Sequence, residues 1–253
     1  LHIHECMQND DGFPPNRHTF LALLKACISL SRLEYGRKLH SAIVVEDLLS
    51  DLYVVHMLVD MYAKHGFLVE SRDVFNELKE DCRNVVAWSA LIGGYAEYGP
   101  YEEALECLET MKSEGIQLNS FTFVATLKAC CALGYLEKGR EIHTETVVKG
   151  FDVDVFIANT LIDLYATCSS ILEAETVFDG MADRDIVSWN ALIGGHVKQG
   201  LEEDALLCIQ QMQLENMSPV SVTFTSLLKS CISKQSIGRV HELHSDILKR
   251  GYE

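Results

Sequence analysis

Two stretches of this chain are near copies of each other, and an internal copy limits a chain to folds built from repeated units. Residues 85–111 are VVAWSALIGGYAEYGPYEEALECLETM, and residues 186–212 are IVSWNALIGGHVKQGLEEDALLCIQQM. Trp88 and Trp189 lie 101 residues apart, and each is followed, after one residue, by Ala-Leu-Ile-Gly-Gly. The chain is therefore predicted to be a repeat protein.

Two further sets of matching segments fill the space between these copies. The first set is TFLALLKAC, TFVATLKAC and TFTSLLKSC, and each final cysteine is followed 13 residues later by a histidine. The second set pairs LVDMYA at 58–63 with LIDLYA at 161–166. Three unit types therefore alternate in a fixed order. Cutting the chain at equivalent points gives a partial unit 1–16, complete units 17–51, 52–84, 85–119, 120–154, 155–185 and 186–220, and an incomplete unit 221–253.

The apolar spacing within each unit is that of an α-helix. Phe123, Leu127 and Cys130 follow one another at i, i+4 and i+7, which places them on one helical face. A turn divides each unit into two helices, and one such pair cannot bury its own apolar face. Neighbouring pairs are expected to stack into a solenoid, with first helices on its concave side and second helices outside. The recurring Gly36 and Gly139 are expected to let the two helices of a pair approach closely.

The charge balance bears on whether such a solenoid binds nucleic acid. Lys plus Arg is 21 and Asp plus Glu is 37, a net charge of -16. This balance argues against a strongly electrostatic interface, because basic side chains supply most sequence-independent affinity for phosphate. The acidic runs 102–103 and 202–204 are expected to open second helices and to face outward. No apolar run reaches the roughly 18 residues that a membrane span needs, so no membrane partner is expected.

Three patterns suggest a metal or a catalytic site, and we interpret the first as packing, the second as a coincidence and the third as an incomplete motif. Cys130 and His143 are both zinc-ligand types, but they fall on different helices without the paired spacing of a zinc site. The segment HELH at 241–244 is one residue short of His-Glu-x-x-His. The segment HTE at 143–145 matches part of a zinc deaminase motif, but no Pro-Cys-x-x-Cys follows. We predict no enzyme activity, no catalytic residue, no metal and no cofactor. The nine cysteines are expected to be small buried residues in a reducing compartment.

The interleaved motifs resemble the pentatricopeptide repeat family, and specifically its plant-type subclass in which standard, long and short units alternate. The standard units carry VVAWSALIGGY and IVSWNALIGGH, the long units TFxxLLKAC with a Gly-Arg-x-x-His tail, and the short units VHMLVDMYAKHG and ANTLIDLYATC. Tetratricopeptide repeats fit worse, because their length does not alternate. The resemblance implies an all-α fold, a right-handed superhelical solenoid of stacked antiparallel helix pairs that spans residues 1–253 as one domain.

The resemblance also implies sequence-specific recognition of single-stranded RNA, with one base for each unit. In the family, the fifth and last residues of a unit address the base edge, and the second residue packs on the base face. Carried over to this sequence, the recognition pairs are Ser89 with Asn119, Asn159 with Asp185, Asn190 with Val220, and His56 with Asn84; the base-packing residues are Val86, Phe156, Val187 and Tyr53. The first pair resembles an adenine-preferring pair and the second a uracil-preferring pair. The third, which lacks a polar last residue, implies a pyrimidine preference, and the fourth is not decoded.

The long units are expected to space the array more than to recognise bases. Their fifth residues include Leu21 and Val124, whose side chains form no hydrogen bond. Lys64 and Lys198, near the ends of first helices, are candidate phosphate contacts, and the alternative is that they are solvated helix ends. With the amino-terminal unit at the 5′ end, as in the family, the expected RNA is A, one unrecognised base, U and then a pyrimidine.

We expect the chain to be a piece of a longer array. The resemblance implies the RNA-binding part of a C-to-U editing factor, or of another RNA-processing factor, in a chloroplast or mitochondrion. A small editing-factor protein is a further expected partner, docked on the long units. The alternative is a protein-protein interaction scaffold that does not bind RNA, which the acidic balance and the apolar fifth residues favour.

Overall fold

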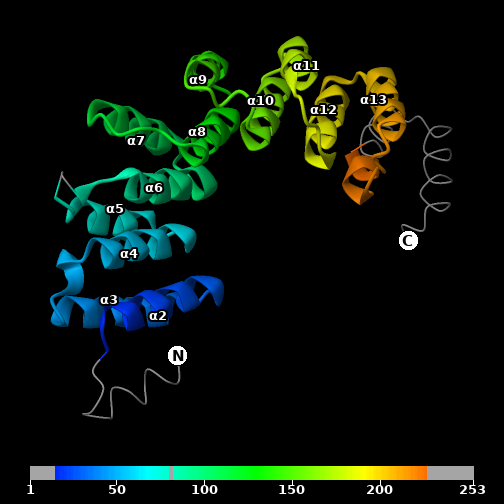
Figure 1. Cartoon of the computed structure of the whole chain (residues 1–253). Coiled ribbons are helices and arrows are strands. Elements are labelled where there is room, and N and C mark those ends of the chain that lie inside the picture. Colours follow the sequence, from blue (N-terminus) through cyan, green and yellow to red (C-terminus); the bar gives the residue numbers. More distant parts are fainter. Residues whose placement is uncertain (1–14, 80–81, 227–253) are drawn as a thin grey trace. The chain divides into compact units, whose positions relative to one another are not determined.

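The computed structural model describes residues 15–79 and 82–226, and the regular elements in these ranges are all helical (Figure 1). Residues 1–129 and 130–253 form two compact units, whose boundary falls within α8, and each is described separately. Most of the partial unit 1–16 and most of the incomplete unit 221–253 lie outside the described residues. The helices are α2 (Arg17–Ser29), α3 (Leu33–Val45), the 3-10 turn η1 (Leu48–Ser50), α4 (Leu52–Lys64), α5 (Leu68–Asn76), α6 (Val85–Tyr98), α7 (Tyr101–Ser113), α8 (Ser120–Leu133), α9 (Leu136–Val148), α10 (Val155–Thr167), α11 (Ile171–Gly180), α12 (Ile186–Gln199) and α13 (Glu202–Leu214).

The first helix of each pair begins where the sequence divides into units, and a polar cap is the reason at most of these starts. The Asp51 carboxylate accepts hydrogen bonds from the backbone N–H groups of Tyr53 and Val54, at 3.0 and 3.3 Å. Such a cap satisfies N–H groups that have no partner within the helix. The second helices α3, α5, α7, α9, α11 and α13 have no side-chain cap. The equivalent caps of α2, α6, α10 and α12 are Asn16, Asn84, Asp154 and Asp185.

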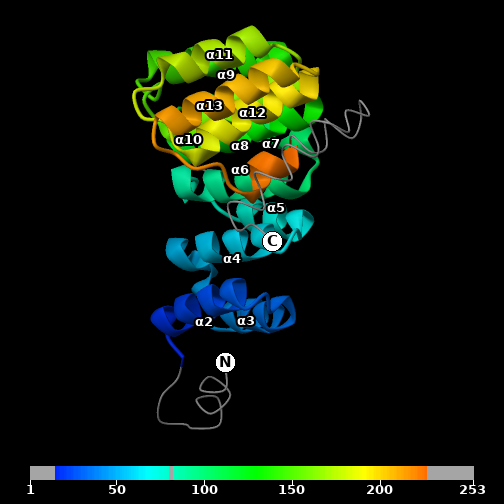
Figure 2. The same ribbon diagram turned by 90° about the vertical axis from the view of Figure 1, so that its right-hand side faces the viewer.

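In the unit formed by residues 1–129, the first helices stack on one another in chain order. Helix α2 packs on α4 and α4 packs on α6, while α3, α5 and α7 each pack on the first helix of their own pair (Figures 1 and 2). The core consists of apolar side chains such as Leu24, Leu58 and Leu91, which are fully buried. Phe75 of α5 and Trp88 of α6 join successive pairs, with ring centroids 4.5 Å apart.

The unit formed by residues 130–253 repeats this packing. Helix α10 packs on α11 and α12, and α12 packs on α13. Phe178 of α11 and Trp189 of α12 occupy the places of Phe75 and Trp88, with ring centroids 4.6 Å apart. None of the helices in the described part of the chain is long and apolar enough to cross a membrane.

The recurring glycines allow a close approach, but not within their own helix pair as we expected. A Cβ atom added at Gly36 of α3 would lie 2.8 Å from the Met61 sulfur of α4, which is the first helix of the next pair. At Gly139 of α9 the added atom would clash with Leu164 of α10. The prediction named the wrong partner, because a small residue in a sequence does not show which neighbour approaches it.

The recurring cysteines of the long units lie in the core. Cys27 and Cys130 are fully buried. Burial raises the pKa of the Cys130 thiol to about 12, so this thiol stays protonated near neutral pH. Both side chains therefore pack as small apolar groups.

Candidate nucleic-acid interface

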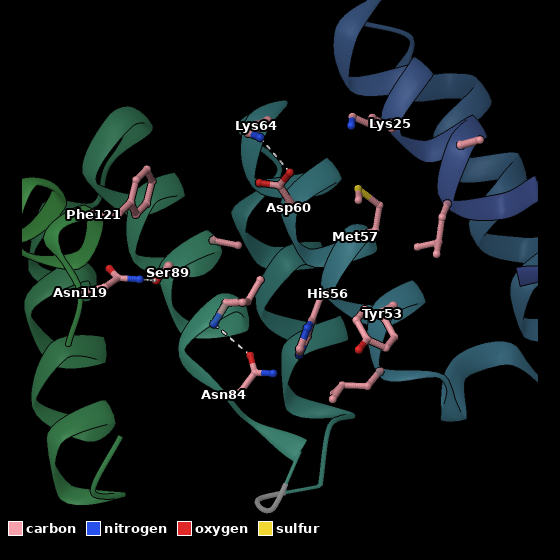
Figure 3. Close-up of a pocket in the computed structure, with 15 residues that line it drawn as sticks. Lys25, Tyr53, His56, Met57, Asp60, Lys64, Asn84, Ser89, Asn119 and Phe121 are labelled. Carbon is pink, nitrogen blue, oxygen red and sulfur yellow. Dashed lines mark hydrogen bonds and ion pairs between the residues drawn. The ribbon is translucent and has the colours of Figure 1, made fainter. Parts of the chain in front are cut away.

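A cavity of about 780 Å³ opens on the first helices of the unit formed by residues 1–129 (Figure 3). Its walls come from α2, α4, α6 and the start of α8. Most of the residues that the sequence assigns to base recognition in this unit line it together: Tyr53, His56, Asn84, Val86, Ser89 and Asn119. The stacking of α4 on α6 causes this, because equivalent positions of successive first helices come to lie side by side.

The pair Ser89 and Asn119 is in direct contact. The Asn119 amide nitrogen donates to the Ser89 hydroxyl oxygen at 3.4 Å, and the two side chains point toward each other in Figure 3. The Asn119 amide oxygen is engaged elsewhere, because it accepts the backbone N–H of Thr122 at 2.9 Å. Helix capping thus fixes the orientation of this amide, with its oxygen toward the helix start and its nitrogen toward Ser89.

The pair His56 and Asn84 lines the same cavity without a direct hydrogen bond between its members in the described structure. The Asn84 amide oxygen caps α6 by accepting the N–H groups of Val86 and Ala87, which leaves the amide nitrogen for a ligand. His56 is buried, and burial lowers the pKa of its ring, so the imidazole is neutral near pH 7.

The pair Asn159 and Asp185 is in contact in the other compact unit. The Asn159 amide nitrogen donates to Asp185 Oδ1 at 3.3 Å, and the same oxygen accepts the N–H and the hydroxyl of Ser188 at 2.8 and 2.9 Å. Burial acts to raise the pKa of Asp185, but the hydrogen bonds from Ser188 and Asn159 outweigh it and lower that pKa. Asp185 is therefore ionised at neutral pH.

The pair Asn190 and Val220 differs from the others, because Val220 has no polar side-chain atom. The Asn190 amide oxygen instead lies 2.6 Å from the hydroxyl of Thr223, in the helical residues that follow Val220. Sequence analysis did not single out Thr223. It begins the repeated segment TFTSLLKSC, to which the sequence analysis assigned no role in base recognition.

The predicted base-packing residues are exposed apolar side chains at the starts of the first helices. Exposure of such large apolar groups is unfavourable in a free chain, and it suits a surface that a flat aromatic ligand covers. The sequence analysis named no such residue in unit 120–154, yet Phe121 stands at its second place and lines the cavity. Alignment of the second residues of all the repeat units is enough to identify Phe121 as an equivalent of the others. The exposed fractions are 64% for Tyr53, 57% for Val86, 56% for Phe121, 76% for Phe156 and 57% for Val187.

The candidate phosphate contacts are both paired with carboxylates. Lys64 donates to Asp60 at 2.8 Å, and Lys198 lies 3.5 Å from Asp163 and 3.0 Å from the Thr167 hydroxyl. Ion pairs that are this exposed are weak, so exchange of a carboxylate for a phosphate has a small cost. The acidic runs open α7 and α13 as expected, except that Glu202 is buried rather than facing outward.

The recurring histidines form packing contacts. His143 Nδ1 of α9 lies 2.8 Å from the Tyr165 hydroxyl of α10, and His40 of α3 lies 2.9 Å from that of Tyr62 of α4. No group of three metal-ligating side chains occurs among residues 15–79 and 82–226. A second cavity, of about 540 Å³, lies beside Trp189 and His196 and contains none of the predicted recognition residues.

Two related family models match segments of this chain. "PPR repeat family" matches residues 83–132 and 184–233, and "PPR repeat" matches residues 53–82 and 156–186. Together the matched segments make up more than half of the chain.

Several curated relatives are pentatricopeptide repeat-containing proteins of Arabidopsis thaliana. One is 37% identical over 228 residues, which cover 90% of this chain and 31% of that protein. A second, named as chloroplastic, is 35% identical and is covered to 44%, with 92% of this chain matched. A third, named as mitochondrial, is 34% identical and is covered to 23%, with 95% of this chain matched. The chain thus spans less than half the length of these relatives.

Solved structures share the fold. The pentatricopeptide repeat protein PPR10 in complex with an 18-nt psaJ RNA element matches with a TM-score of 0.88 at 22% identity, over 100% of this chain and 38% of that chain. PPR10 from maize matches with a TM-score of 0.73 at 21% identity, over 98% of this chain and 36% of that chain. At this identity the likeness establishes the all-helical repeat fold.

Proposed function

We propose that this chain, which belongs to the pentatricopeptide repeat family, binds single-stranded RNA with one base for each helix pair. It acts as the RNA-recognition part of a factor for C-to-U editing or other RNA processing in a chloroplast or mitochondrion, and it is not itself an enzyme. The alternation of standard, long and short units is part of this proposal.

One observation carries the proposal. The cavity on α2, α4 and α6 brings exposed apolar side chains of second places next to polar side chains of fifth and last places. Tyr53 and Val86 offer surfaces for the face of a base, and Ser89 with Asn119 offers donors and acceptors for its edge. Apolar stacking combined with edge recognition is how proteins bind unpaired RNA bases.

The expected RNA follows from the order of the units. Ser89 with Asn119 recognises adenine, the next unit leaves its base unrecognised, Asn159 with Asp185 recognises uracil, and Asn190 recognises a pyrimidine. The preferred sequence is therefore 5′-A-N-U-Y, where N is any base and Y a pyrimidine. The acidic net charge predicts affinity that depends mainly on base contacts and only weakly on salt.

The test is an anisotropy titration of the chain with labelled RNA that contains 5′-ANUY, against a scrambled RNA of the same composition. Tighter binding of the first RNA is expected. Phe156→Ala is expected to lower the affinity by about 5- to 150-fold, because stacking on an aromatic ring contributes about 1–3 kcal/mol per base. Leu172→Ala, at an equally exposed apolar residue of a second helix, is the control and should bind like the wild type.

Absence of RNA binding at low salt, or equal binding of both RNAs, would overturn the proposal. It would favour the alternative, a protein-protein interaction scaffold. A specific observation supports a protein partner in either case. Val45 and Val148 end the second helices of two long units, at equivalent places, with 82% and 81% of their surfaces exposed. Each is an exposed apolar residue of its own compact unit, and we assign the docking of a small editing-factor protein to the long unit that carries it.

A further inference from the structure

The junctions after the two standard units differ at the last residue and at the fifth residue, and the hydroxyl of the threonine that follows bonds differently in each. At the first junction the last residue is Asn119, which caps Thr122 and also donates to the fifth residue, Ser89. At the second junction the last residue is Val220, which can do neither. The fifth residue there, Asn190, needs another partner to fix its amide.

Thr223 supplies that partner. Its side chain is 1% exposed, and its hydroxyl oxygen accepts the backbone N–H of Val220 at 3.1 Å. The same oxygen lies 2.6 Å from the Asn190 amide oxygen, a distance typical of O–H···O bonds and short for N–H···O bonds. The hydroxyl accepts from Val220 through a lone pair and donates its proton to the Asn190 amide oxygen.

The equivalent threonine at the first junction behaves differently. The Thr122 hydroxyl also accepts a backbone N–H, from Asn119 at 3.0 Å, but donates to the Asn119 carbonyl oxygen at 2.7 Å. The Thr122 hydroxyl does not bond to the fifth residue, Ser89, because the Asn119 amide already donates to Ser89. At the second junction the last residue, Val220, has no amide and the fifth residue is the longer Asn190, and the threonine hydroxyl bonds to that fifth residue.

The bond fixes what Asn190 can offer to a base. Its amide oxygen is taken by Thr223, so the amide NH₂, a pure donor, is the group left for a ligand. Asn159 is oriented the other way, because its NH₂ group donates to Asp185. Cytosine carries two adjacent acceptors, N3 and O2, on its Watson–Crick edge, whereas uracil carries a donor, N3–H, at the centre of that edge. A fixed amide donor therefore favours cytosine.

We infer that Thr223 is the positioning residue of unit 186–220, in place of the apolar Val220, and that it makes this unit prefer cytosine to uracil. The inference rests on the proposed function, because it concerns the choice of base within RNA that the chain binds. It narrows the pyrimidine preference that Asn190 alone implies.

The test compares binding of the 253-residue chain to RNAs ending in 5′-ANUC and 5′-ANUU. The wild type is expected to prefer the C-containing RNA by about 3- to 10-fold, the factor that one net hydrogen bond confers. Thr223→Val, which removes only the hydroxyl, is expected to bring the ratio close to one, and Thr223→Ser to keep it. Ser226→Ala is the matched control, because the Ser226 hydroxyl bonds to the Val222 carbonyl within the same helix and leaves the ratio unchanged.

Val220→Asn provides a second variant that keeps Thr223 and its burial. It restores the residue found at the first junction, and it should turn the hydroxyl away from Asn190 and reduce the C-over-U ratio. An unchanged ratio in both Thr223→Val and Val220→Asn overturns the positioning role. Wild-type binding of 5′-ANUY RNA with no preference for C overturns the inference and leaves the proposed function standing. Absence of any RNA binding overturns the proposed function itself.

Discussion

His40 and His143 occupy equivalent places in the two compact units, and each pairs with a tyrosine of the next first helix. Their ring nitrogens lie 2.9 and 2.8 Å from the hydroxyls of Tyr62 and Tyr165. Burial lowers the pKa of both imidazoles below the ordinary 6.5. The folded chain therefore keeps these rings neutral at a pH where the unfolded chain protonates them.

A pH dependence of stability follows from these histidines. Because their pKa values are lower in the folded chain, the unfolded chain binds more protons as the pH falls below about 6.5. The stabilisation is thus present above pH 6.5 and is lost as the pH falls below it. Urea unfolding at pH 7.5 and 5.5 should show a lower free energy of unfolding at pH 5.5. The double variant His40→Gln, His143→Gln should show a smaller difference.

The control for this experiment is His18→Gln, at an exposed residue, which should keep the wild-type pH dependence. An identical dependence in the double variant and the wild type would contradict the account. The comparison of pH 7.5 with pH 5.5 reports the titration of the histidines rather than that of Glu173 and Asp185. The pKa values of these two carboxyl groups are lowered, so their effects on stability fall at more acidic pH.

For individual residues, the sequence predicted which of them recur, but not which atoms they contact. The spacing of Cys130 and His143 indicated packing rather than metal binding, and the structure places His143 against Tyr165. The partnership of Asn190 with Thr223 was not predicted. A threonine hydroxyl can donate to a carbonyl of its own turn or to a neighbouring helix, and residue spacing does not determine which acceptor it uses.

Adjacent glycines in helix α12 have opposite surroundings. A Cβ atom added at Gly195 would lie 2.7 Å from the Ala166 side chain of α10, whereas one added at Gly194 meets nothing within 4 Å. Gly195 is required by the contact between the stacked first helices α10 and α12. Gly194 has no such role and carries only the entropic cost of glycine in a helix.

Substitution of these two glycines should change stability in opposite directions. Gly195→Ala is expected to lower the free energy of unfolding by about 1–3 kcal/mol, because the core has no space for the added methyl group. Gly194→Ala is expected to raise it by about 0.5–1 kcal/mol. Urea unfolding of both variants beside the wild type measures this. Changes of the same sign would show that the packing of α12 on α10 differs from that described.

Helices were the most predictable feature of this chain. Six first helices begin at the residues where the motifs divide the sequence, because an Asp or Asn cap recurs before most of them. The partner of the small residues was harder to predict. Gly139 contacts α10 rather than the α8 helix of its own pair, since a second helix also touches the next first helix in the stack.

For the molecule as a whole, the distribution of charge matters more than its sum. The chain carries a net charge of -16, and acidic residues cluster in the first turns of α7 and α13, both second helices. The predicted recognition residues lie on first helices or at their caps. In the proposed function, the acidic chain presents RNA with a largely apolar and amide-lined surface, where base contacts rather than phosphate contacts determine affinity.

The helical repeat fold could be predicted from the internal copies, because matching motifs at fixed spacing determine how helix pairs stack, and the family followed from the resemblance of those motifs. The base preferences rest on pairs of side chains, and two such pairs, Ser89 with Asn119 and Asn159 with Asp185, are in contact in the structure. Contact places the polar groups of a pair side by side, where the edge of one base can meet both of them.

The most direct test of this account is a change of specificity at one unit. The double variant Asn159→Thr, Asp185→Asn should shift the preferred base at the third position of 5′-ANUY from U to A, since it makes the pair similar to Ser89 with Asn119. Binding is measured with RNAs that carry each of the four bases at that position. The preference for A two bases upstream should stay unchanged in the same molecule and serves as the internal control. An unchanged preference for U at the third position would contradict recognition of one base by each unit.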